Sequence, residues 1–211
     1  MHWNKKCLKD AKLYLILDAQ VSSHQNLLKA LKGAVRFGVD IVQLRDKNAD
    51  TKKILAFCKH ALKITQHRVP FIVNDRVDLA LIAGADGVHL GQEDIPYLQA
   101  RKLMGANAII GVSCQNLAHA KQACAQGADY IGFGSVFKTL TKPERNPMNL
   151  KLLARVLAQT KIPVFPIGGI SRANIGQLTT IGAYRAAVCR DILLANDAGK
   201  VVYELKAKLR G

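Results

Sequence analysis

The stretch Phe71–Asp94, FIVNDRVDLALIAGADGVHLGQED, shows the pattern on which the chain is built. The apolar runs Pro70–Val73 and Gly87–Leu90 flank one short amphipathic segment, Val77–Ala83. Each apolar run is followed directly by polar residues. This pattern predicts a strand, a helix and a second strand, with polar side chains placed where each strand ends.

Two carboxylates follow these strands and indicate a cation site. Neighbouring parallel strands lie about 4.8 Å apart, so we expect Asp75 and Asp94 to project over one edge of the sheet. Two carboxylates with amide side chains nearby suit Mg²⁺, a hard ion that takes oxygen ligands. Because Asp is a favoured N-cap, each could instead cap a helix, one beginning at Arg76 and the other at Ile95. The two roles are compatible.

Composition favours a partner that is small and anionic. The 211 residues include 31 basic and 15 acidic side chains, which give a formal net charge of +16. That charge is compatible with nucleic acid, but the lysines are spread along the chain and no nucleic-acid-binding motif is evident. Attraction of phosphorylated small molecules follows equally from the same charge. We therefore expect small-molecule substrates and no nucleic-acid partner.

The sequence also bears on compartment and domain organisation. No apolar run reaches the length of about 18 residues that a bilayer requires, so no membrane span is expected. Five cysteines without CxxC spacing indicate reduced thiols in a cytoplasmic protein and argue against a zinc site. No linker interrupts the chain, which predicts one catalytic domain over residues 1–211. Whether it forms a homo-oligomer is left open.

Eight apolar runs alternate with helical patterns. The expected strands are Leu13–Asp18, Ile41–Leu44, Pro70–Asn74, Gly87–Leu90, Ile109–Ser113, Tyr130–Gly134, Val164–Gly168 and Ala186–Cys189. The expected helices are Gln25–Phe37, Thr51–Gln66, Val77–Ala83, Tyr97–Met104, Leu117–Gln126, Leu150–Ala158, Arg172–Ile181 and Ala198–Leu209. Eight such units predict an α/β fold, a closed (β/α)8 TIM barrel. A doubly wound open sheet is the alternative, but the first strand lacks a G-x-G-x-x-G loop.

In such a barrel the loops after the strands share the face that carries the active site. Alternation after the second strand places Gln43, Arg45 and Lys47 on one side, as a candidate clamp for a mono- or diphosphate. A solvated charged loop is the alternative. In the fourth strand, His89 is interpreted mainly as a hydrogen-bonded residue in or near the core, with a smaller case for catalysis. Ser113, after the fifth, is a ligand donor or a helix cap.

The sixth strand is followed by the longest loop, residues 134–147. A βα loop usually has about 2–6 residues, and greater length is typical of a lid or binding loop. Thr139, Thr141 and Lys142 offer hydroxyls and an ammonium group to a charged substrate. A disordered basic loop is the alternative.

Glycines follow the seventh strand. Gly168-Gly169, together with Cys189-Arg190 after the eighth strand, match the phosphate site common in these barrels. Glycine lets backbone N–H groups approach phosphate oxygens, and a helix N-terminus adds favourable partial charge. The fold and the glycines together therefore predict a phosphate site.

With these elements in view, the chain resembles the thiamine-phosphate synthase family over about residues 13–194. The motifs that carry the resemblance are QLRDK, VNDRVDLALIAGADGVHLGQED, IGVS, FGSVFKTLTKP and PIGGI, all in family order. The resemblance implies a transferase. It would condense 4-amino-2-methyl-5-hydroxymethylpyrimidine diphosphate with 4-methyl-5-(2-phosphooxyethyl)thiazole by a dissociative, Mg²⁺-assisted substitution that releases pyrophosphate.

The resemblance also implies roles for single residues. Mg²⁺ would be held by Asp75 and Asp94. The pyrimidine diphosphate would be bound by Gln43, Arg45, Lys47, Asn74 and Lys142, with Ser113 close to it. The thiazole phosphate would be bound by Thr139, Thr141, Gly169, Cys189 and Arg190. We expect catalysis from Arg45, Lys47 and Lys142, which would stabilise charge on the departing pyrophosphate without a covalent enzyme intermediate.

Three departures from the family pattern concern the site. Arg76 stands where many members have a second Asp, and Lys138 replaces a usual Pro. Cys189-Arg190 stands where an aliphatic residue and Ser are usual. Arg190 could grip the thiazole phosphate better than a hydroxyl, or Asp191 could neutralise Arg190 and change the ligand preference.

Two other functions stay open at this point. A thiazole tautomerase-like isomerase on the same fold should not need the phosphate clamp together with both metal carboxylates. A non-catalytic binder of nucleic acid or of phosphorylated thiamine intermediates would keep the pockets on a basic surface. Salt-dependent binding with many phosphate contacts would favour the nucleic-acid version.

Overall fold

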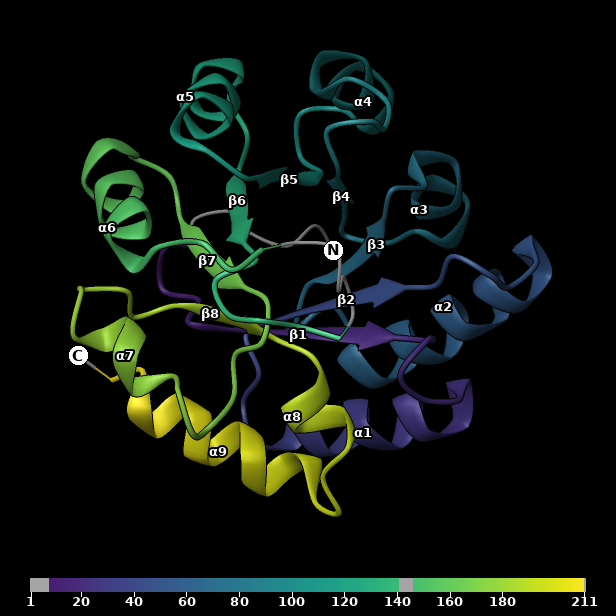
Figure 1. The fold of residues 1–211 in the computed structure, drawn as a ribbon. Helices are drawn as coiled ribbons and strands as arrows, with labels where there is room; N and C mark the ends of the chain where they lie inside the picture. The colour runs from purple at the N-terminus through teal and green to yellow at the C-terminus, as the bar shows by residue number, and fades with distance from the viewer. Residues whose placement is uncertain (1–7, 141–145, 211) are drawn as a thin grey trace.

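Eight parallel strands close into a barrel in the computed structural model, which describes residues 8–140 and 146–210 (Figure 1). Each strand pairs with the next along the chain, and the first closes the barrel against the last. The strands are β1 (Leu13–Asp18), β2 (Ile41–Arg45), β3 (Phe71–Asn74), β4 (Gly87–Leu90), β5 (Ile109–Cys114), β6 (Tyr130–Gly134), β7 (Val164–Ile167) and β8 (Ala186–Val188). The prediction of a (β/α)8 barrel is confirmed.

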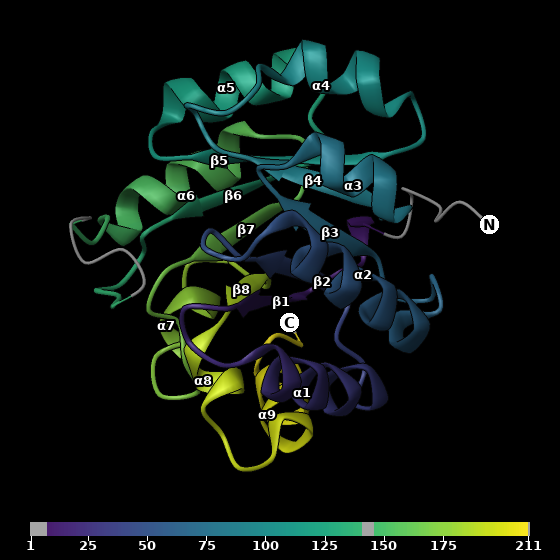
Figure 2. The same cartoon turned by 90° about the vertical axis from the view of Figure 1, so that its right-hand side faces the viewer.

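Helices surround this barrel on the outside (Figures 1 and 2). They are α1 (His24–Arg36), α2 (Thr51–Thr65), α3 (Val77–Ala83), α4 (Tyr97–Met104), α5 (Leu117–Gln126), α6 (Leu150–Gln159), α7 (Gly176–Thr179), α8 (Arg190–Leu193) and α9 (Ala198–Lys208). Among the helices of the described residues, none combines the length and the apolar character that crossing a membrane requires.

Two helices differ from the sequence-based expectation. The helix expected over Arg172–Ile181 is reduced to α7, because Asn174 holds the preceding segment as a turn. Its Oδ1 accepts from the Ser171 N–H at 2.9 Å and its Nδ2 donates to the Gly169 carbonyl at 2.8 Å. Such side-chain bonds to the backbone compete with helix formation. The short α8 was not predicted at all.

Strand β1 shows how the sequence fills both faces of the barrel wall. All six of its residues are buried. Leu13, Leu15 and Leu17 pack in the cluster shared with the helices, whereas Tyr14 and Ile16 belong to the cluster inside the barrel. Side chains alternate along a strand, so a wall covered on both faces is apolar almost throughout. The interior cluster fills the barrel, and polar groups are left for the strand ends.

The helix starts contradict one set of sequence-based alternatives. Helix α3 begins after Arg76 and α4 after Pro96, and neither has a side-chain cap. Asp75 and Asp94 therefore cap neither helix. Helix α5 is capped by Asn116, so the capping role for Ser113 is also wrong. In each case the loop continues for at least one residue between the candidate cap and the helix.

Candidate active site

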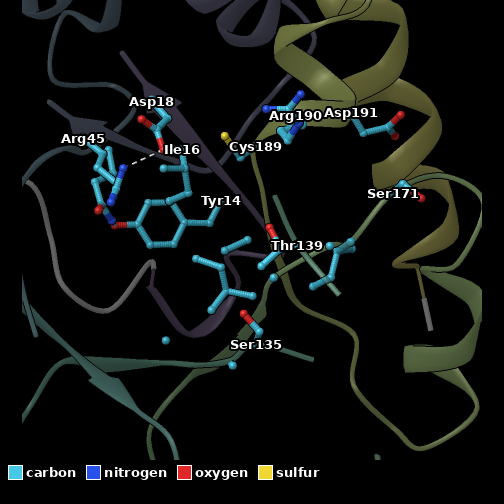
Figure 3. A pocket seen from close by; sticks show the side chains of 18 of the residues that line it. Tyr14, Ile16, Asp18, Arg45, Ser135, Thr139, Ser171, Cys189, Arg190 and Asp191 are labelled. Atoms are coloured by element: carbon cyan, nitrogen blue, oxygen red, sulfur yellow. Dashed lines mark hydrogen bonds and ion pairs between the residues drawn. The ribbon is translucent and has the colours of Figure 1, made fainter. Parts of the chain in front are cut away.

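A cavity of about 510 Å³ opens at the carboxyl ends of the strands, and every strand or its following loop contributes to the lining. We divide the lining into two sets. The N-terminal wall comprises Asp18, Gln43, Arg45, Asn74, His89 and Ser113. The C-terminal wall comprises Ser135, Thr139, Gly168, Gly169, Cys189 and Arg190. Figure 3 shows Asp18 and Arg45 on one side of the cavity and Arg190 on another, with Thr139 and Ser135 lower in the view.

Arg45 reaches the cavity from the last residue of β2, where a buried carboxylate holds it. Its Nη1 donates to Asp18 Oδ2 at 2.9 Å and to Gln20 Oε1 at 2.9 Å (Figure 3). The strand register sets this pair, since Asp18 and Arg45 are partners across β1 and β2. Asp18 is completely buried, so the ion pair fixes the guanidinium and partly offsets its charge. Sequence reasoning missed Asp18, although an acidic residue closing the first strand was visible.

Lys47 is not among the residues that line the cavity together with Gln43 and Arg45. Strand β2 ends at Arg45, and the alternation of side chains applies only within the strand. Lys47 instead lies beside the cavity, with its Nζ 3.1 Å from Asp75 Oδ2, and its side chain is about half exposed. The predicted clamp is therefore divided between the cavity lining and its rim.

The Asp75 and Asp94 carboxyl groups lie together beside Lys47. Burial, followed by the hydrogen-bonded Asp75 carboxyl, raises the pKa of Asp94 above its usual value. The Gly91 N–H donates to Asp94 Oδ2 at 2.6 Å and orients that group. Two carboxylates at such close range repel each other when both are charged, and a divalent cation with oxygen ligands relieves the repulsion. The pair therefore fits a cation site, although no cluster of three or more candidate ligands occurs in residues 8–140 and 146–210.

The cavity floor carries a series of buried polar groups. Gln43 Nε2 donates to the Tyr14 hydroxyl at 2.5 Å, which lies 2.7 Å from the Tyr130 hydroxyl. His89 Nδ1 lies 3.1 Å from the Tyr130 hydroxyl, and His89 Nε2 lies 2.9 Å from Ser113 Oγ. Burial raises the pKa of both tyrosine hydroxyls, so they stay protonated. The interpretation of His89 as a hydrogen-bonded interior residue is confirmed. The two tyrosines were not recognised in the sequence, because an aromatic in a strand usually indicates only core.

Asn74 is the last residue of β3 and lines the cavity. Gln43 on β2 and His89 on β4 line it from the two neighbouring strands. Thr139 lies in the loop after β6 and lines the opposite side. Thr141 and Lys142 fall outside the described residues, so their predicted roles are not placed by the structure. The remaining candidates from the sequence all line the cavity or lie in the cluster of Lys47, Asp75 and Asp94.

Backbone forms much of the C-terminal wall. Gly168 and Gly169 follow β7 with φ angles of 102° and 65°, which favour glycine. A Cβ on Gly169 would also overlap the Lys138 carbonyl oxygen, so this turn packs directly against the loop after β6. Burial raises the pKa of the Cys189 thiol to about 12, which keeps it neutral and unsuited to nucleophilic attack.

Arg190 and Asp191 open α8, but they do not pair with each other. Asp191 Oδ2 accepts from the Arg172 backbone N–H at 2.8 Å and from Arg172 Nε at 3.2 Å. Arg172 also donates to Glu204 Oε2 at 2.9 Å. The alternative in which Asp191 neutralises Arg190 is therefore wrong, because Arg172 takes that carboxylate. Among the described residues, Arg190 has no ion pair and lines the cavity.

The closed barrel and its cavity define the class of protein: a (β/α)8 barrel with a cavity at the carboxyl ends of its strands, where the active sites of such barrels lie. The family model described as thiamine monophosphate synthase matches residues 13–192. The chain belongs to this family, whose members are transferases, and the predicted family is confirmed.

Individual relatives agree with this assignment. The thiamine-phosphate synthase of Gloeobacter violaceus is 44% identical over 194 residues, which are 92% of this chain and 56% of that protein. The thiamine-phosphate synthase of Clostridium acetobutylicum is 38% identical over 206 residues, 94% of this chain and 96% of that protein. A solved thiamine phosphate pyrophosphorylase from Pyrococcus furiosus has a TM-score of 0.85 and 35% identity, and covers 94% of this chain and 95% of its own. The chain thus spans little more than half of some relatives and nearly all of others.

Proposed function

We propose that the chain condenses 4-amino-2-methyl-5-hydroxymethylpyrimidine diphosphate with 4-methyl-5-(2-phosphooxyethyl)thiazole, giving thiamine phosphate and pyrophosphate. One observation carries the proposal: a single cavity has two unlike walls, each with an arginine side chain in its lining. Arg45 lies in the first, and Gly169 and Arg190 lie in the second. Two phosphorylated substrates can thus meet in one enclosed space, which turns a bimolecular reaction into an effectively unimolecular one. The family and the relatives named above support the same reaction.

The N-terminal wall and its rim are the proposed site for the pyrimidine diphosphate. Arg45 is already oriented by Asp18, and Lys47 reaches the same rim from the next loop. Both cations would stabilise charge on the departing pyrophosphate, and Lys142 is the proposed third. Further contacts to this substrate are proposed for Gln43, Asn74 and Ser113.

Asp75 and Asp94 are the proposed ligands of Mg²⁺. Their two carboxylates, held together at the rim, supply hard oxygen donors of the kind that this ion prefers. When bound, the ion supplies neutralisation of the diphosphate charge. Lys47 would then turn from Asp75 to the substrate, because the cation takes over its role as counter-charge.

The C-terminal wall is the proposed site for the thiazole phosphate. Gly169 brings the backbone close to the cavity, and Arg190 has no competing ion pair within the described chain. A guanidinium binds phosphate through two parallel hydrogen bonds. Thr139, Thr141 and Cys189 complete the proposed set.

The proposed chemistry requires no nucleophile from the protein. Departure of pyrophosphate breaks the bond between the pyrimidine methylene carbon and oxygen and leaves a resonance-stabilised cation. The thiazole nitrogen then supplies the electron pair of the new carbon–nitrogen bond. The chain's residues hold the two substrates in line and limit the access of water to the cation. The neutral, half-buried Cys189 thiol agrees with a route without a covalent intermediate.

The two rival functions explain less of the site. A tautomerase acting on a thiazole alone would leave the paired carboxylates at the other wall without a role. A non-catalytic binder is disfavoured by relatives that carry the enzyme's name. We propose further that the two substrates are the chain's partners, with no nucleic acid among them, and that residues 1–211 act as one catalytic domain in the cytoplasm.

The test is direct synthesis. Purified protein is incubated with both substrates and Mg²⁺, and thiamine phosphate and pyrophosphate are measured. Both products should appear in equal amounts, and EDTA should abolish them. Folded protein that forms neither product would overturn the proposal, and assay of thiazole tautomerisation on the same preparation would then test the rival.

A further inference from the structure

Five polar side chains from five strands form one continuous series of hydrogen bonds beneath the cavity. The series runs from Gln43 through Tyr14, Tyr130 and His89 to Ser113, with donor–acceptor distances of 2.5, 2.7, 3.1 and 2.9 Å. Both ends, Gln43 and Ser113, line the cavity. We call this series the polar relay. It connects two groups on different strands that can each bind a ligand.

Core packing fixes the middle of the polar relay. The Tyr14 and Tyr130 rings are almost completely buried, and each meets Phe165 edge to face, with ring centroids 5.5 and 5.7 Å apart. Tyr130 also stacks on His89 at 5.5 Å. Gly111 makes room for this arrangement, since a Cβ there would overlap the Tyr130 ring. The hydroxyl positions are therefore set by the barrel interior and do not depend on a ligand.

The polar relay can be satisfied in a consistent direction. Gln43 Nε2 donates to the Tyr14 oxygen, so the Tyr14 proton is directed to Tyr130. Tyr130 then donates to Nδ1 of a neutral His89, and His89 Nε2–H donates to Ser113 Oγ. This leaves an acceptor, Gln43 Oε1, at one end and a donor, the Ser113 hydroxyl proton, at the other. Gln43 Oε1 has no partner among the described residues and is open to the cavity that Gln43 lines.

We propose that the polar relay makes Tyr14, Tyr130 and His89 positioning residues that select a 4-aminopyrimidine over its 4-oxo counterpart. This inference rests on the proposed function, because it concerns the pyrimidine substrate of that reaction. An aminopyrimidine presents an amino N–H donor, which matches the acceptor at Gln43 Oε1. The 4-oxo form presents a carbonyl acceptor in the same place, which is the reverse pattern. To accept it, every bond of the relay would have to change direction.

The direction of each hydrogen bond in the polar relay depends on the direction of the next, and this dependence fixes the orientation of the Gln43 amide. A lone Gln amide can rotate by half a turn and exchange its donor and acceptor at little cost, so it discriminates poorly. Here rotation would leave Tyr14 facing Gln43 Oε1 and would require reversal at Tyr130 and His89 as well. A site whose polar groups are fixed rejects a mismatched ligand because buried groups are left unpaired.

The experiment compares two pyrimidine diphosphates, the 4-amino compound and the 4-oxo analogue. Dissociation constants for each are measured by calorimetry in Mg²⁺ without the thiazole substrate, for wild type, Tyr130→Phe and Tyr14→Phe. We expect the wild-type preference for the amino compound to fall about five- to tenfold in both variants, the effect of a neutral hydrogen bond. Tyr97→Phe is the matched control, because it removes a buried hydroxyl that donates to the Gly127 carbonyl outside the barrel. Its preference should not change.

The outcomes separate the inference from the proposed function. A purely structural role would weaken both ligands equally, so an unchanged preference in folded Tyr130→Phe and Tyr14→Phe overturns the relay. Synthesis of thiamine phosphate by the wild type is assayed in parallel. If it occurs while the preference is unchanged, the proposed function stands alone. If the wild type neither forms product nor binds the amino compound, both are overturned. Tyr14→Phe leaves the Tyr130–His89–Ser113 bonds in place and serves if Tyr130→Phe does not fold.

Discussion

The N-terminal and C-terminal walls face one cavity but handle charge in different ways. On the N-terminal side, charged groups are already paired: Arg45 with Asp18, and Lys47 with Asp75. On the C-terminal side, Gly168 and Gly169 expose backbone, and Arg190 has no ion pair among the described residues. Under the proposed function, the first wall would exchange these counter-ions when a diphosphate and a cation bind. The second wall would bind a phosphate without first breaking an ion pair of Arg190.

The largest effect is expected from the rim of the N-terminal wall. Asp75→Ala removes one of the two proposed metal carboxylates and should lower kcat/KM about 100-fold or more at millimolar Mg²⁺. Raising the Mg²⁺ concentration should restore part of the activity, as measured by thiamine phosphate formation. Asp78→Ala is the control, because its exposed carboxylate pairs with Arg76 on the outer helix α3. Normal activity of Asp75→Ala at low Mg²⁺ would contradict the proposed metal site.

On the C-terminal wall, Gly169→Ala should have the next largest effect. Its φ of 65° costs about 1 kcal/mol for a residue with a Cβ, and the overlap with the Lys138 carbonyl adds to this. We expect the KM for the thiazole phosphate to rise more than about tenfold and the melting temperature to fall. Gly84→Ala is the matched control, with a φ of 68° and no atom within 4 Å of the added Cβ. Equal behaviour of the two variants would mean that the close approach at Gly169 is unimportant.

Arg190→Ala probes whether the second wall is indeed ready for its ligand. Loss of a charge-assisted hydrogen bond should raise the KM for the thiazole phosphate about tenfold. The KM for the pyrimidine diphosphate should stay the same. Arg155→Ala removes the same charge from an exposed position on α6 and controls for long-range attraction. A rise in both KM values for Arg190→Ala would show that this residue does not belong to one wall alone.

The smallest effect concerns stability at the paired carboxylates. The raised pKa of Asp94 means that the folded state holds this proton more tightly than the unfolded chain does. Ionisation of Asp94 therefore destabilises the folded state. The effect is absent below the unfolded pKa of about 3.9 and is complete once the pH has risen through the raised pKa of the folded state. Asp94→Asn should raise stability at pH 7.5 in EDTA by less than about 1 kcal/mol after solvent screening, and should be neutral near pH 3.

Thermal unfolding at the two pH values measures this effect. Adding Mg²⁺ should reverse the order at pH 7.5, since only the wild type gains stability by binding the ion well. An Asp94→Asn protein that is less stable than the wild type in EDTA at pH 7.5 would show that repulsion between Asp75 and Asp94 is not the dominant interaction.

Local patterns account for most of what could be read in advance. Strands β1, β4 and β6 have the predicted bounds, because apolar runs of alternating orientation are fixed by short-range sequence. The shortened α7 was not foreseen, since the hydrogen bonds of Asn174 to Gly169 and Ser171 compete with the helical pattern. Lys47 does not line the cavity with Gln43 and Arg45, and the alternation on which its placement was predicted ends with the strand at Arg45.

The sequence by itself determined the eight βα units, and with them the edge at which Gln43, Arg45, Asp75 and Asp94 gather. That much follows from the period of two along strands and from the rule that strand ends share a face. Only the tertiary structure decided which groups neutralise one another. Asp18 meets Arg45 across 27 positions and Tyr14 meets Tyr130 across 116, while Asp191 goes to Arg172 instead of its neighbour Arg190. Such partners are chosen by barrel closure and burial, which act between residues far apart in the chain.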